Sequence, residues 1–144
     1  NKKIKKAPQN HTLVFKNEKE SERQQASAYQ VGRYKDAINY LDKINNSKRT
    51  KIEQDKINYL KANAYYNLGE YEKAEEFLIN IISKEQSSLL DDALLLKGII
   101  LKQKGKNEEA LLMFSQIISD HPNSEFYSSA QIQKRILSKK NNEK

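Results

Sequence analysis

Residues 69–74 read Gly69-Glu70-Tyr71-Glu72-Lys73-Ala74, and this pattern occurs three times in the chain. The other two copies are Gly32-Arg33-Tyr34-Lys35-Asp36-Ala37 and Gly105-Lys106-Asn107-Glu108-Glu109-Ala110. Successive copies are separated by 37 and then 36 residues. A fixed period of this length is typical of stacked repeats, in which each unit buries its apolar face only against its neighbours.

Apolar residues follow each copy at helical spacing. The residues four and seven positions after the alanine are Leu41 and Ile44, Leu78 and Ile81, and Phe114 and Ile117. Positions i, i+4 and i+7 share one face of a helix, so these residues form an apolar stripe. Periodicity along the 144 residues predicts an all-α chain with helices at about 17–30, 35–46, 52–68, 71–83, 90–104, 107–119 and 124–139.

The small residues of the pattern have different expected roles. Each glycine is expected to turn the chain between two helices, because glycine adopts positive φ without steric cost. Each alanine is expected to be buried where the two helices of a hairpin cross, since a larger side chain would force them apart. The rings of Tyr34, Tyr65 and Tyr71 are expected to fill the wedge between adjacent hairpins.

The complete pattern resembles the tetratricopeptide repeat (TPR). The second repeat is the most faithful, with Ala62, Tyr65, Gly69, Tyr71, Ala74 and Leu78, while Asn107 replaces the turn aromatic in the third. Gly98 takes the small-residue position of the third repeat, and Pro122 stands where the family places its proline. The resemblance covers about residues 17–140. It implies a right-handed α-α superhelix of three hairpins, at about 17–50, 51–87 and 88–123, with a C-terminal capping helix at 124–140.

The capping helix is expected to be shaped like the first helix of a further repeat. Its residues Ile132, Ile136 and Leu137 then take the positions of Leu96, Ile100 and Leu101 in the third repeat.

The net charge of +7 is confined to the two ends of the chain. Residues 1–23 and 134–144 each carry a net charge of +4, whereas residues 24–133 carry −1. Nucleic-acid binders usually gather basic residues on a folded face, so this distribution argues against a nucleic-acid partner. An RNA-associated helical-repeat protein that uses basic tails remains an alternative. Residues 1–16 are expected to be a linker or flexible arm, and residues 141–144 a disordered tail.

The residues that carry chemistry do not form a recognisable catalytic or metal-binding pattern. The chain has no cysteine, and its two histidines, His11 and His121, are distant in sequence. Adjacent acidic pairs lie in the first turns of predicted helices, where carboxylates favour the helix dipole. The sequence therefore predicts a non-catalytic protein that needs no cofactor or metal and has no small-molecule substrate.

The TPR resemblance implies a concave face, lined by the first helix of each repeat, that binds a segment of another protein. The positions that the family exposes there are Tyr29, Lys56, Tyr59, Asn63, Tyr66, Asn67, Leu95, Ile99 and Lys102, and the capping helix would add Ser128, Gln131 and Arg135. Tyrosine and arginine are favoured anchors at interfaces. For Tyr29 and Tyr66 a purely structural role, bracing neighbouring helices, is the alternative.

A finer resemblance concerns the third repeat, in Ala93 to Gly98, Glu109 to Leu111 and Ile117 to Ser124. These stretches look like the TPRs of bacterial envelope proteins, of the outer-membrane assembly lipoprotein type and the periplasmic Tol-associated type. The resemblance implies a scaffold in a cell-envelope complex. Because the chain begins at Asn1 rather than Met, we expect a processed product or a fragment of a longer protein. The resemblance implies a periplasmic setting, with attachment to the membrane only through a part outside this chain. A cytoplasmic TPR adaptor is the alternative.

Overall fold

The computed structural model describes residues 20, 23–84 and 86–142. Within them the chain is helical, with residues 23–30 in a first helix that is followed by six longer ones. The longer helices are α2 (Tyr34–Asp42), α3 (Lys51–Asn67), α4 (Tyr71–Ile82), α5 (Leu90–Gln103), α6 (Asn107–Asp120) and α7 (Tyr127–Asn142). A 3-10 turn, η1 (Asn46–Lys48), separates α2 from α3. The all-α prediction is confirmed.

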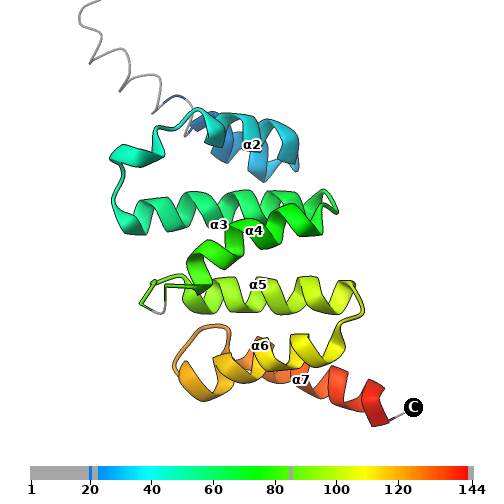
Figure 1. Ribbon diagram of the computed structural model, residues 1–144. Helices are drawn as coiled ribbons and strands as arrows, with labels where there is room; N and C mark the ends of the chain where they lie inside the picture. The colour runs from blue at the N-terminus through cyan, green and yellow to red at the C-terminus, as the bar shows by residue number, and fades with distance from the viewer. Residues whose placement is uncertain (1–19, 21–22, 85, 143–144) are drawn as a thin grey trace, which may run out of the picture.

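The helices form consecutive hairpins stacked along one axis, as expected for a helical-repeat superhelix (Figure 1). Each helix packs on the next, α2 on α3, α3 on α4, and so on to α7. In Figure 1, α4 crosses in front of α3. We call residues 23–30, α3, α5 and α7 the A helices, and α2, α4 and α6 the B helices.

Three identical turns set the repeat. Gly32, Gly69 and Gly105 have φ of 80°, 79° and 78°. After each glycine, a backbone N–H bonds back to the carbonyl five residues earlier: Arg33 to Ala28, Glu70 to Tyr65, and Lys106 to Leu101. These bonds satisfy carbonyls at the end of the A helix, and the B helix begins at once. The predicted glycine turns are therefore confirmed.

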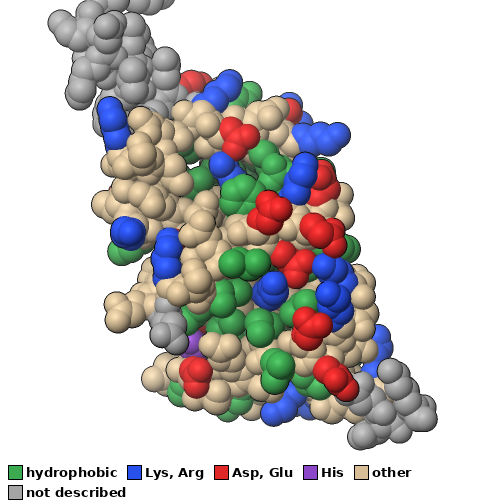
Figure 2. Space-filling view, viewed as in Figure 1, with side chains coloured by type: hydrophobic (Ala, Val, Ile, Leu, Met, Phe, Trp, Pro, Cys, Tyr) green, Lys and Arg blue, Asp and Glu red, His purple; other side chains and the backbone are tan. Residues whose placement is uncertain are grey.

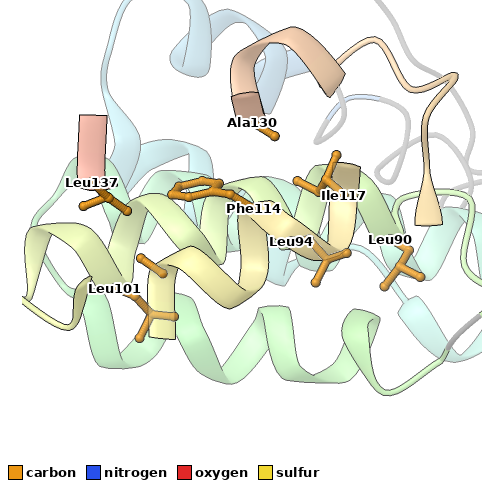
Figure 3. Close-up of a cluster of buried hydrophobic side chains, with 8 residues drawn as sticks. Leu90, Leu94, Leu101, Phe114, Ile117, Ala130 and Leu137 are labelled. Carbon is orange, nitrogen blue, oxygen red and sulfur yellow. The ribbon is translucent and has the colours of Figure 1, made fainter. Parts of the chain in front are cut away.

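Three apolar clusters hold the stack together. The first joins α2 to α3 through Leu41, Ile44 and Ile57, and the second joins α3, α4 and α5. The third joins α5, α6 and α7 around the buried ring of Phe114 (Figure 3). The alanines Ala37, Ala74 and Ala110 are completely buried, as predicted for hairpin crossings.

The aromatic residues pack differently from the expectation that they fill the wedge between hairpins. Their ring contacts lie within one hairpin: Tyr29 with Tyr34, Tyr65 with Phe77, and Tyr66 with Tyr71. Tyr65, Tyr66 and Tyr71 also border the second cluster, which joins two repeats. The rings therefore pair within a hairpin, and those of the second repeat also pack on the apolar cluster shared with the third repeat.

The helix ends differ from the sequence prediction by more than one residue in three places. The helix α2 ends at Asp42, four residues early, because the connection to α3 contains η1. The helix α7 begins at Tyr127 rather than 124, since Ser124 Oγ accepts a hydrogen bond from Phe126 N in the preceding turn. It continues to Asn142, so the tail predicted at 141–144 is helical at 141 and 142. The linker predicted at 1–16 lies outside the described residues.

Candidate protein-binding surface

The A helices present the predicted binding residues, and α3 contributes most of them. Tyr59 and Tyr66 are half-buried and pack against the second cluster, so each shows part of its ring to solvent. The ring of Tyr66 also contacts Tyr71, with 5.9 Å between ring centroids. Such half-buried rings are held rigidly by the core and lose little entropy when a partner covers them.

The polar residues of α3 lie beside these rings. The Asn67 side-chain N–H donates to the Asn63 carbonyl oxygen at 2.8 Å and to Asn63 Oδ1 at 3.1 Å. The amide NH2 group of Asn67 is therefore already engaged by Asn63 in the free protein. A partner backbone would have to share or replace the bond to Asn63 Oδ1. Lys56 is exposed and lies at the rim of a pocket of about 250 Å³ between the first helix, α2 and α3.

Tyr29 is half-buried like the other predicted tyrosines, but its hydroxyl group is enclosed. Its ring meets Tyr34 edge to face, with centroids 5.3 Å apart. Its hydroxyl oxygen is buried without a hydrogen-bond partner among the described residues. The pKa of Tyr29 is raised, first by burial and then by the neighbouring phenols of Tyr59 and Tyr34. These contacts match the alternative role of bracing, and a contact with a partner stays a prediction for Tyr29.

The α5 residues form an aliphatic part of the same face. Leu95 and Ile99 are half-buried against the third cluster. Lys102 Nζ donates to Gln133 Oε1 on α7 at 2.7 Å. The ammonium predicted to meet a partner's carboxylate therefore already has a neutral hydrogen-bond acceptor, and it could still take a carboxylate in addition because an ammonium has three donors.

A carboxylate pair lies at the start of α5, next to Tyr59. The hydroxyl of Ser124 donates to Asp91, and Asp92 N donates to Asp91 Oδ1 at 2.9 Å. Burial, together with the hydrogen bond and charge of Asp91, raises the pKa of Asp92 to about 7. Burial and the charges of Asp92 and Asp91 raise the pKa of Tyr59 to about 12. The sequence placed these acids in the first turn of a helix, and the family positions put Asp92 on the concave face, but the proximity of the pair to Tyr59 was not predicted.

The register of α7 differs by one residue from the prediction. Ile132 and Ile136 were expected to be buried like Leu96 and Ile100, which are 5% and 0% exposed, but they are 48% and 40% exposed. Leu137 is fully buried, as predicted, and Ala130 is fully buried as well; both point into the third cluster (Figure 3). The exposed Ile132 and Ile136 lie 37 residues after Leu95 and Ile99, which are themselves partly exposed, so a step of 37 from α5 to α7 fits their exposure and a step of 36 does not.

This shift changes which α7 residues belong to the concave face. With a step of 37, Ile132, Ile136 and Lys139 take the positions of Leu95, Ile99 and Lys102. A step of 36 places Ser128, Gln131 and Arg135 there; all three are exposed, and their contact with a partner stays a prediction. The small residue Ala130 at the crossing with α6 was the signal in the sequence that could have set the register.

The surface formed by the B helices differs from the A-helix face in its distribution of charged side chains. In Figure 2, which shows the side where α4 lies in front of α3, acidic and basic side chains are interspersed with hydrophobic ones. Ile79 on α4 and Leu112 on α6 are the most exposed aliphatic residues of these two helices, at 55% and 66%. Interspersed charges of both signs are typical of a solvated surface.

The described residues hold no group of three or more histidine, cysteine or acidic side chains that could bind a metal ion. In the same part of the chain, no helix combines the length and the apolar character needed to cross a membrane.

Comparison with known proteins gives the family. Residues 28–90 and residues 92–124 each match a family model described as tetratricopeptide repeat, and together they cover more than half of the chain. No curated protein matches the chain significantly. Tetratricopeptide repeats are generally non-catalytic and form scaffolds that bind other proteins or peptides. The three glycine turns, the buried alanines and these matches agree: the chain belongs to the tetratricopeptide repeat family.

Proposed function

We propose that this TPR domain is a non-catalytic adaptor that binds a segment of another protein on its A-helix face, around Tyr59, Tyr66, Leu95 and Ile99. The observation that carries the proposal is the row of half-buried aromatic and aliphatic side chains on α3 and α5. Each is anchored in the core and partly open to solvent, which is the environment typical of interface hot spots.

We further propose that the domain works in a bacterial cell-envelope complex, on the periplasmic side, and is held to the membrane by a part of the protein outside this chain. The support is the third-repeat sequence, from Ala93 to Gly98 and from Ile117 to Ser124, which resembles envelope TPRs. In this setting the adaptor holds two envelope proteins together and performs no chemistry itself.

The test uses the chain as bait against separate envelope and soluble extracts of its native cells, with captured proteins identified by mass spectrometry. The dissociation constant of the captured partner is then measured for Tyr59→Ala and Ile99→Ala. Each should lose about 1–4 kcal/mol of binding free energy if it is a hot spot. Lys73→Glu, an exposed change on α4, is the matched control and should bind normally.

Two results would contradict the proposal. If only Lys73→Glu weakens binding, the partner uses the B-helix face. If the partner is captured only from the soluble extract, the envelope setting is wrong while the adaptor role stands.

A further inference from the structure

We propose that two copies of this chain associate through α5 and α7, so that α7 of each copy lies antiparallel along α5 of the other. The pair would have a twofold axis, because each copy offers both halves of the contact. Three features of α5 and α7 support this pairing: an exposed apolar stripe, charges of opposite sign at its two ends, and the register between them.

The apolar part of this surface comes from α5 and α7 together. Ile132 and Ile136 are one turn apart on α7 and exposed, while Leu95 and Ile99 are one turn apart on α5 and half-buried. The two helices run side by side in the same direction, since Ser124 bonds to Asp91 near their first turns and Lys102 bonds to Gln133 further along. The result is two parallel aliphatic ridges, against which another helix can pack.

The charges at the ends of this surface have opposite sign. Asp91 and Asp92 lie at the N-terminal end of α5, and neither is paired with a cation among the described residues. Lys102 lies near the C-terminal end of α5, and Lys139 and Lys140 lie in the last turn of the α7 helix. A surface that is acidic at one end and basic at the other complements a copy of itself in the antiparallel orientation, and repels it in the parallel one.

The spacing along the helices matches this pairing. The midpoint between Leu95 and Ile99 is residue 97, and the midpoint between Ile132 and Ile136 is residue 134. When these midpoints face each other in antiparallel helices, Asp92 and Lys139 both lie five residues from the midpoint, about 7.5 Å along the axis, on the same side. The aliphatic pairs then meet and Asp92 faces Lys139 of the second copy.

Burial of Asp92 supports the pairing as well. Its raised pKa reflects a carboxylate that is partly removed from water beside a second carboxylate. A lysine from the second copy would relieve this repulsion and lower the pKa of Asp92. The other charged group facing Asp92 is Glu125, which also favours a cation there.

The experiment measures the mass of the full 144-residue chain alone by sedimentation equilibrium, at pH 8, between about 1 µM and about 1 mM, the range in which weak association is detected. The mass should rise from 16.8 kDa toward twice that value. The double variant Ile132→Ser/Ile136→Ser should remain monomeric and folded, because both side chains are already exposed. The control Ile79→Ser/Leu112→Ser removes two still more exposed aliphatic residues from the B helices and should associate like the parent chain.

A charge exchange tests the register. Asp92→Lys should lower the association constant by about tenfold or more through repulsion from Lys139 of the second copy, and adding Lys139→Asp should restore it. A parent chain that stays at 16.8 kDa throughout would overturn the proposal, as would loss of association in the control or failure of the exchange to restore it. Leu95 and Ile99 belong to both proposed contacts, so a second copy would compete with a partner on α5 while Tyr59 and Tyr66 on α3 would belong to the partner contact alone. Because sedimentation is measured without the partner, a chain that stays monomeric overturns self-association and leaves the adaptor role standing, whereas loss of partner binding in Tyr59→Ala tests the adaptor role alone.

Discussion

Gly98 is the position at which one added methyl group should have the clearest effect on stability. It lies inside α5, and a Cβ built there would be 2.5 Å, 2.7 Å and 3.0 Å from three ring carbons of Phe114. The ring belongs to the third cluster and is completely buried, so it has little room to move. The change Gly98→Ala should therefore push α5 and α6 apart or force the ring from its preferred rotamer.

The expected magnitude comes from two opposing terms. Replacing glycine by alanine inside a helix stabilises by about 1 kcal/mol, since alanine loses less backbone entropy. Overpacking a close contact costs about 1–3 kcal/mol. Because separations below 3.0 Å place the clash toward the upper part of that range, we expect a net loss of about 1 kcal/mol, or about 4 °C in melting temperature for a chain of this size.

The assay is urea and thermal unfolding followed by helical circular dichroism, in a double-mutant cycle with Phe114→Leu. Replacing the ring by a smaller side chain opens space at the contact, so in that background Gly98→Ala should become stabilising. The sign reversal distinguishes a steric clash from a general intolerance of alanine. If Gly98→Ala raises the melting temperature in the parent chain, the argued contact between α5 and α6 is wrong.

Other perturbations have definite expected outcomes. Ala74→Leu should lower the free energy of unfolding by about 1–3 kcal/mol, because the hairpin crossing has no room for a larger side chain, and an unchanged urea midpoint would count against the crossing. Gly105→Ala should cost about 1–2 kcal/mol through its positive φ alone, while Gly105→Asn should cost less, and equal losses in the two melting curves would contradict that cause. The raised pKa of Asp92 means that the folded state holds a proton that the unfolded chain releases near pH 4. The stability it contributes is present below the unfolded pKa and is lost as pH rises toward 7. Asp92→Asn should therefore make the free energy of unfolding less dependent on pH between about 4 and 7, and an unaltered profile would refute the assignment. A chelator should leave helical circular dichroism and melting unchanged, and a clear drop would reveal a metal requirement.

The sequence predicted the repeat well because local chemistry sets it. A glycine turn followed by an alanine and an apolar stripe fixes where each hairpin begins, and Gly69 with Ala74 does so without help from distant residues. The seventh helix lacks this reference point, since it follows Pro122 and carries no turn glycine before Ala130. Its rotation is decided by packing against α6, and a step of one residue moved Ile132 and Ile136 to the exposed side.

The candidate surface was only partly predictable for the same reason. The positions of Tyr59, Asn63 and Tyr66 on one face follow from helical spacing alone. Contacts between helices do not: Lys102 to Gln133 spans 31 residues, and Ser124 to Asp91 spans 33. Such contacts depend on how neighbouring repeats are stacked, which a pattern within one repeat does not specify.

The way these contacts are distributed along the stack has a mechanical consequence. The later junctions are cross-braced: Lys84 and Ser87 bond to the buried Asp55, and Glu75 takes both Lys97 and Lys104 from α5. The junction between α2 and α3 has the ion pair of Lys61 with the largely exposed Asp42, and it also contains the 250 Å³ pocket. We therefore expect the resistance of the superhelix to extension to increase toward its C-terminal end. Under tension the first hairpin should separate from the stack first, while α3 to α7 stay packed together, lengthen slightly and return when the tension is released.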